Sequence, residues 1–260
     1  MDAVLSIAGS DSCGGAGIQA DLKTFEAFNL FGTSVITVLT AQNTTGVKDI
    51  YEVDASFVKS QIISILEDFD IKAIKVGMLF NKEIITVVKD TIKNLDIPIV
   101  LDPVFVSKAG SPLLETEAIN ELKDFCQYAK VITPNMYEAK QLFDYDEDEV
   151  HDLSKLRELK TNVLVKKHKK IINDVKYCID YLYTKNEIKS FHTDYLETNN
   201  LHGTGCTLSS AIAANLALGH NLKEAIRISK DYVYEAILKA PNLGKGNGVI
   251  NHKVLDKKTI

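Results

Sequence analysis

The chain's fold is decided near its start, where the apolar run Ala3-Val-Leu-Ser-Ile-Ala8 leads directly into a glycine-rich turn, Gly9–Gly17. Apolar residues at helical spacing then extend from Ile18 to Phe28. A continuous apolar run of this length is typical of a strand that is buried on both faces of a sheet. The segment therefore predicts a strand, a turn that a ligand can approach closely, and a helix, which is the repeating unit of a parallel α/β fold.

The rest of the chain continues this alternation. Further strands are expected at 34–40, 73–77, 98–102, 130–133 and 162–166, and helices at 54–69, 81–95, 116–128, 204–218 and 222–239, with a hairpin over 177–192. Asp54 is placed to cap its helix, and Phe57 is expected on that helix's apolar face. Residues 1–260 contain no repeat or low-complexity linker, so a single domain with a mainly parallel sheet covered on both faces is predicted.

Composition limits the classes of function. Hydrophobic residues make up 45% and charged residues 25% of the 260, as in ordinary globular proteins. The net charge of −5 argues against nucleic-acid binding, and the short basic run Lys166–Lys170 is expected to be mostly solvated. The four cysteines form no C-x-x-C pair and are expected to be free thiols, which argues against a zinc site. With no signal-peptide pattern and no membrane-length apolar run, we expect a cytoplasmic protein without membrane partners.

The strongest chemical signal is His202-Gly-Thr-Gly-Cys-Thr-Leu-Ser209, which opens a helix of small residues. Glycines let backbone N–H groups converge, and the helix N-terminus behind them favours anions such as a phosphoryl group. A glycine-rich helix start that binds nothing is the alternative. Cys206 lies in the same turn, where the helix N-terminus is expected to depress the pKa of a thiol and favour a general base. A small residue buried under the helix explains Cys206 equally well.

The first glycine-rich turn matches neither the dinucleotide-binding pattern nor the Walker pattern. Instead, Gly9–Phe25 resembles the opening signature of bacterial hydroxymethylpyrimidine/phosphomethylpyrimidine kinases. Other segments resemble the same family in the same order, namely Thr40–Thr44, Lys75–Leu79, Leu101–Val104, Ile132–Asn135 with Glu138, His202–Ser209 and Gly244–Gly248.

This resemblance implies a ribokinase-like fold, a three-layer α/β/α sandwich that is commonly dimeric. It also implies Mg²⁺- and ATP-dependent phosphorylation of 4-amino-5-hydroxymethyl-2-methylpyrimidine and of its monophosphate, in thiamine biosynthesis. Carried over residue by residue, it assigns the substrate pocket to Gln42, Asp21, Ala16, Gly9, Met78 and Val104. It assigns catalysis to Cys206 and the amides of Gly203, Thr204 and Gly205, ATP binding to Lys166, Thr204 and Lys245, and Mg²⁺ to Glu138 and Asp102.

The chain departs from the family at the nucleotide side. Family members usually carry Lys-Gly-Gly-His where this chain has Lys166-Lys-His-Lys-Lys170, so we expect a loop of different backbone shape there. Two rival functions stay open. A pyridoxal/pyridoxine kinase would share the fold, Cys206 and the anion hole, although Gln42 favours a pyrimidine. A non-catalytic pyrimidine-binding protein would explain the lost glycines, although it would have no use for an anion hole.

Overall fold

The computed structural model describes residues 1–106, 110, 113–145 and 160–255. One sheet organises these residues, with the strand order β3-β2-β1-β4-β5-β6-β7-β8-β9. The strands are β1 (Ala3–Asp11), β2 (Phe31–Asn43), β3 (Gly46–Glu52), β4 (Ile71–Val76), β5 (Ile99–Leu101), β6 (Val131–Ile132), β7 (Asn162–Ile172), β8 (Val175–Tyr183) and β9 (Ile188–Asp194).

Parallel pairing runs unbroken through the middle of the sheet, from β2 through β1, β4, β5 and β6 to β7. Antiparallel strands complete both edges, with β3 beside β2 and the β8–β9 hairpin beside β7. Since the central strands are all parallel, their carboxyl ends meet along one edge, where such sheets bind ligands.

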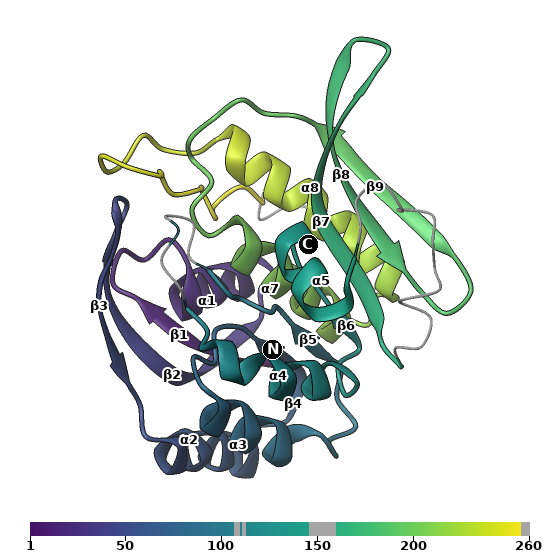
Figure 1. Ribbon diagram of the computed structural model, residues 1–260. Coiled ribbons are helices and arrows are strands. Elements are labelled where there is room, and N and C mark those ends of the chain that lie inside the picture. Colours follow the sequence, from purple (N-terminus) through teal and green to yellow (C-terminus); the bar gives the residue numbers. More distant parts are fainter. Residues whose placement is uncertain (107–109, 111–112, 146–159, 256–260) are drawn as a thin grey trace.

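Helices cover both faces of the sheet (Figure 1). One face carries α2 (Ala55–Asp68), α3 (Lys82–Ile92), a short 3₁₀ turn η1 (Thr116–Ala118), α4 (Ile119–Cys126) and α5 (Met136–Phe143), and the other carries α1 (Gly17–Ala27), α7 (Thr204–Ala217) and α8 (Leu222–Leu238). Each face has its own hydrophobic core, around Phe125 on the first and Phe25 on the second. The expected three-layer α/β/α sandwich is therefore confirmed.

Local signals located most elements correctly. Asp54 caps α2 by accepting a hydrogen bond from the Ser56 N–H, as its position before the apolar run predicted. Phe57, however, is 61% exposed, and the buried positions of α2 are Val58 and Ile62, so Phe57 was assigned to the wrong face. The edge strand β3 was missed because its residues are half-buried or exposed and show no alternation.

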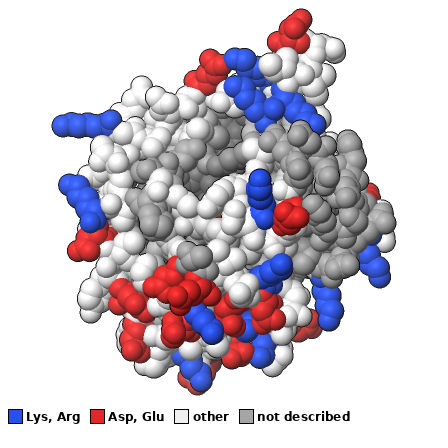
Figure 2. All heavy atoms as spheres, in the orientation of Figure 1, with Lys and Arg blue, Asp and Glu red and all other residues white. Residues whose placement is uncertain are grey.

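Charged side chains gather unevenly on the surface. Figure 2 shows Lys and Arg side chains near the projecting β7–β8 hairpin and Asp and Glu side chains over the layer of α2 to α4. Within the described residues, no helix has the length and hydropathy that crossing a membrane requires.

Candidate active site

A cavity of about 670 Å³ opens at the carboxyl ends of the central strands, against the start of α7. Most of the residues that the sequence assigned to substrate, catalysis and metal meet on its walls, although they are scattered along the chain. They are Gly9, Ala16, Gln42, Met78, Val104, Asp102, Glu138, Lys166, Gly203, Thr204, Gly205 and Cys206. Asp21 and Lys245 are not among the lining residues.

Asp21 lies beneath the cavity wall and not on it, which corrects its assignment to the substrate pocket. Its carboxylate is fully buried and accepts hydrogen bonds from the Lys75 ammonium at 2.7 and 2.9 Å and from the Ser6 and Ser210 hydroxyls at 2.6 Å. A buried carboxylate with this many donors is a structural anchor. It positions Lys75, which does line the cavity.

Lys75 is a functional candidate that the sequence reasoning missed. Burial alone would lower its pKa, but the carboxylates of Asp21 and Asp102 hold the pKa of Lys75 above its usual value. Gly77 leaves space for this side chain, since a Cβ there would lie 2.8 Å from the Lys75 Nζ. The sequence did contain a signal for this role, since Lys75 lies within the apolar run of a central strand. A charge buried there needs a partner of opposite charge.

The start of α7 forms the floor of the cavity. Its N-cap, Gly203, adopts a left-handed φ of 85°, and a Cβ there would lie 1.7 Å from the Gly15 carbonyl oxygen. Only glycine allows the two glycine-rich segments to approach this closely. The Thr204 N–H donates to the Leu201 carbonyl at 3.3 Å. Within the described residues, the N–H groups of Gly205 and Cys206 have no backbone acceptor, as expected for a helix N-terminus that is open to an anion.

The thiol of Cys206 does not have the depressed pKa expected from its place in the sequence. Burial, together with the nearby carboxylates of Asp21 and Asp102, raises its pKa, although Lys75 and a hydrogen bond from the Gly17 N–H act in the opposite direction. Sequence position reveals the favourable helix N-terminus but not the depth of burial, which is the larger effect here. Burial therefore favours the neutral thiol of Cys206 over the thiolate.

Acidic and basic side chains meet deeper in the cavity. Asp102 accepts hydrogen bonds from the Lys166 ammonium at 2.7 Å and the Thr133 hydroxyl at 2.9 Å. Burial would raise the pKa of Asp102, but Lys166 and Lys75 hold it below its usual range. Burial raises the pKa of Glu138 to about 7, with repulsion from Asp102 adding to the rise and attraction to Lys166 opposing it. Two buried carboxylates in one cavity are the oxygen donors that Mg²⁺ prefers, so the residues present fit such an ion.

A β-bulge lies next to Lys166, in the segment that lacks the family's paired glycines. The register between β7 and β8 shifts between Val165 and His168, so β7 continues as a strand to Ile172 where a loop was expected. Bulges re-aim side chains next to active sites. Lys166 is 3% exposed and its neighbour His168 is also buried, so the basic run is less solvated than the sequence suggested.

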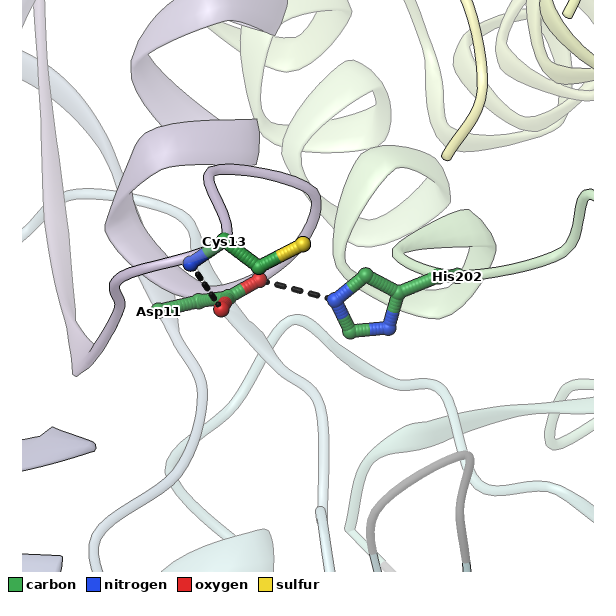
Figure 3. Close-up of side chains that lie close together, drawn as sticks. All are labelled: Asp11, Cys13 and His202. Carbon is green, nitrogen blue, oxygen red and sulfur yellow. Dashed lines mark hydrogen bonds and ion pairs between the residues drawn. The ribbon is translucent and has the colours of Figure 1, made fainter. Parts of the chain in front are cut away.

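Gln42 belongs to a hydrogen-bonded network on the cavity wall, away from Asp102 and Glu138. Figure 3 shows two of its other members, Asp11 and His202. The pKa of Asp11 is lowered because hydrogen bonds from His202 and the Ala16 N–H outweigh its burial. The His202 Nε2 lies 2.8 Å from this carboxylate and must donate to it. The Thr40 hydroxyl uses its proton on the Ser10 carbonyl oxygen at 2.9 Å.

These two facts determine the orientation of the Gln42 carboxamide. One end of the carboxamide, placed as Nε2, lies 3.4 Å from the His202 Nε2. The other end, placed as Oε1, lies 3.3 Å from the Thr40 Oγ1. The one Nε2 proton of His202 is already donated to Asp11, and an NH₂ facing that N–H would place two donors together. The carboxamide is therefore oriented with its oxygen toward His202 and its NH₂ toward the Thr40 lone pair. One N–H and one lone pair of Gln42 then remain for a ligand. Asp11 and His202, which the sequence reasoning did not assign, are thus positioning residues.

A second cavity of about 300 Å³ adjoins the first. Lys166, Thr204 and Leu201 line both cavities and mark the junction between them. Lys169 and Tyr195 line the second cavity and contact each other, with the ammonium 4.4 Å from the ring centroid. Lys245, expected at the nucleotide, is exposed on a loop whose backbone N–H groups donate to the Thr44 hydroxyl, and it lines neither cavity.

Comparison with known proteins identifies the family. The family model for phosphomethylpyrimidine kinase matches residues 11–251. The hydroxymethylpyrimidine/phosphomethylpyrimidine kinase of Haemophilus influenzae is 40% identical over 257 residues, which cover 96% of each chain. A phosphomethylpyrimidine kinase structure from Clostridium difficile is 38% identical with a TM-score of 0.78, covering 91% of this chain and 100% of that one. An ADP complex of Bacillus subtilis pyridoxal kinase is 33% identical with a TM-score of 0.87, covering 98% of both. The chain therefore belongs to the phosphomethylpyrimidine kinase family, and it is a phosphotransferase of ribokinase-like fold.

Proposed function

We propose that this enzyme transfers the γ-phosphoryl group of ATP to 4-amino-5-hydroxymethyl-2-methylpyrimidine and then to the resulting monophosphate. One observation carries the proposal: two cavities of different size meet at Lys166 and Thr204, next to the open amides at the start of α7. An alcohol in the larger cavity and a nucleotide in the smaller one would therefore meet where both a cation and N–H donors await the transferring group. Nucleotide complexes of structural relatives support this use of ATP.

Ring recognition follows from the orientation of Gln42. The carboxamide is left with one N–H donor and one oxygen lone pair, side by side. An aminopyrimidine presents the complementary pair, an amino donor next to a ring-nitrogen acceptor, as adenine does toward glutamine in other proteins. Gly9, Ala16, Met78 and Val104 line the same cavity and supply apolar contact for the ring.

The chemistry at the alcohol belongs to Cys206. Its sulfur takes the hydroxyl proton as a thiolate, which Lys75 and the Gly17 N–H stabilise. The amides of Gly203, Gly205 and Cys206, together with Lys166, stabilise the charge on the transferring group. Asp102 and Glu138 would hold Mg²⁺, which would neutralise phosphate charge. Since the thiol has a raised pKa, transfer to the alcohol should accelerate as the pH rises toward alkaline values.

The proposal also covers the domain organisation, the oligomeric state and the cellular location of the protein. We expect one catalytic domain over residues 1–260, a homodimer, and a cytoplasmic location without nucleic-acid or membrane partners. The family resemblance supports the dimer, and the net charge of −5 supports the lack of nucleic-acid binding.

A pyridoxal/pyridoxine kinase is the second candidate, because a pyridoxal kinase structure has a TM-score of 0.87 with this chain. Incubation with Mg·ATP and each of hydroxymethylpyrimidine, its monophosphate, pyridoxal and pyridoxine, followed by mass spectrometry, separates the two. We expect both pyrimidines to be phosphorylated at higher kcat/KM than either pyridine. Preference for a pyridine would establish the second candidate, and no product from any acceptor would favour a non-catalytic binding protein.

A further inference from the structure

Three side chains with different donor atoms converge beside the acceptor cavity, as Figure 3 shows. Asp11 is the last residue of β1, Cys13 lies in the loop between β1 and α1, and His202 comes from the segment before α7. A carboxylate oxygen, a sulfur and an imidazole nitrogen, one from each, all lie within 4.8 Å of one another. No other such group of three occurs among the residues that the structure describes.

We propose that Asp11, Cys13 and His202 form a zinc site that inhibits the enzyme when it is filled. Sulfur and imidazole nitrogen are ligands of Zn²⁺, whereas Mg²⁺ prefers oxygen alone. Tetrahedral bonds of about 2.0–2.3 Å place zinc ligands roughly 3.3–3.8 Å apart. The cluster therefore needs to contract by at most about 1 Å at its widest pair, which rotation of the half-buried Cys13 side chain can supply.

Most of the site is rigid before any ion arrives. The Asp11 Oδ2 accepts hydrogen bonds from the N–H groups of Gly15 at 3.1 Å and Ala16 at 2.8 Å. Its Oδ1 accepts only the Cys13 N–H among the described contacts, at 2.8 Å, so a lone pair remains for an ion. The close approach of Gly203 to the Gly15 carbonyl locks the two contributing segments together. Preformed ligands reduce the ordering cost of binding.

The position of the cluster implies competition with the acceptor. Asp11 and His202 line the cavity whereas Cys13 does not, so an ion held by all three would lie at the cavity wall. An ion between Asp11 and His202 would replace the hydrogen bond that joins them and remove the proton that orients Gln42. Zinc binding itself is independent of the proposed function, but competition with the pyrimidine rests on it.

Metal binding is tested on the nucleotide-free enzyme without any acceptor. Zn²⁺ is titrated against a chromogenic chelator, and Co²⁺ serves as a spectroscopic probe whose thiolate bond gives a charge-transfer band. We expect one ion per chain and a thiolate band in the wild type. Cys13→Ser should lose the band and weaken Zn²⁺ binding at least about tenfold, as even outer-shell changes do. Cys206→Ser, the matched control, should keep both. No zinc binding by the wild type, or loss of the band only in Cys206→Ser, overturns the site.

Inhibition is tested with saturating Mg·ATP and varied hydroxymethylpyrimidine. Zn²⁺ should raise the pyrimidine KM of the wild type and leave that of Cys13→Ser unchanged, and the two enzymes should agree within about twofold without zinc because Cys13 does not line the cavity. Equal inhibition of both enzymes, or competition with ATP, overturns the inhibitory role. If hydroxymethylpyrimidine is not an acceptor at all, the metal-binding experiment still decides the site, so the two failures are distinguishable.

Discussion

The two cavities that meet at Lys166 are built in different ways. Two contiguous glycine-rich segments, Gly9–Gly17 and His202–Cys206, form one wall of the larger cavity, and their backbones touch. The smaller one is lined by residues dispersed over β7, β8, β9, α7, α8 and the segment between β9 and α7. A cavity defined by backbone contacts tolerates few changes, whereas one defined by separate side chains can keep its function when the local backbone changes. The segment that lacks the family's glycine pair contains a bulge in β7, and Lys166 still lines the smaller cavity.

This contrast predicts that the largest kinetic effects will come from the backbone-defined cavity. Cys206→Ala removes the proton acceptor but keeps every N–H of the turn, so transfer to the alcohol should fall by roughly 10²–10⁴-fold. Transfer to the monophosphate has no hydroxyl proton of comparable pKa to remove and should fall by less than about tenfold. Product formation is measured separately for the two acceptors. Equal losses in both steps would mean that Cys206 only shapes the turn.

Substitution of Lys166 tests whether the smaller cavity, which separate side chains define, binds ATP. Lys166→Ala removes a charge-assisted hydrogen bond to phosphate, worth about 1.5–3 kcal/mol, so the KM for ATP should rise roughly 10- to 150-fold. Lys170→Ala is the matched control, since Lys170 lines neither cavity and should change the KM by less than about twofold. Because Asp102 loses its partner in Lys166→Ala, circular dichroism must first show a folded enzyme. Equal changes in the two variants would remove Lys166 from the ATP site.

The difference between the cavities also explains which features of the fold and of the site could be predicted from the sequence. The strand-helix alternation predicts the three layers because buried parallel strands and amphipathic helices have distinct periods. The contiguous motifs predict the backbone-defined cavity because their residues keep their spacing when folded. Lys75, Asp11 and His202 were missed because their roles depend on partners far away in sequence, such as Asp21 for Lys75. The raised pKa of Cys206 was missed because burial is a property of the whole fold.

Gln42 tests whether ring recognition is set by the network around it. Gln42→Ala leaves ring polar groups without partners, at a cost of about 1–3 kcal/mol, so the pyrimidine KM should rise roughly 5- to 150-fold while the KM for ATP stays nearly constant. Gln42→Glu sharpens the test, because it keeps the shape but replaces the NH₂ with a second acceptor. That variant should lose affinity for the aminopyrimidine about as severely as Gln42→Ala. An unchanged pyrimidine KM in both variants would contradict the assignment.

The smallest expected effect concerns stability at the deep end of the larger cavity. Burial, with repulsion from Asp102, raises the pKa of Glu138 from 4.5 to about 7. A carboxyl group whose pKa is raised on folding holds its proton more tightly in the folded chain than in the unfolded one. The free energy of unfolding should therefore decrease as the pH rises from about 4.5 to about 7, and this contribution should level off above that range.

Glu138→Gln isolates this contribution. Glu138 sits in a capping box with Asn135, and glutamine fills the same position in such boxes, so the variant keeps the start of α5. The free energy of unfolding is measured by urea titration at several pH values, without nucleotide or metal ion. The stability of the variant relative to the wild type should grow between about pH 4.5 and pH 7 and stay constant above, since only the wild type gains a buried charge there. Parallel curves for the two proteins would show that Glu138 is already ionised across this range, with Lys166 outweighing its burial.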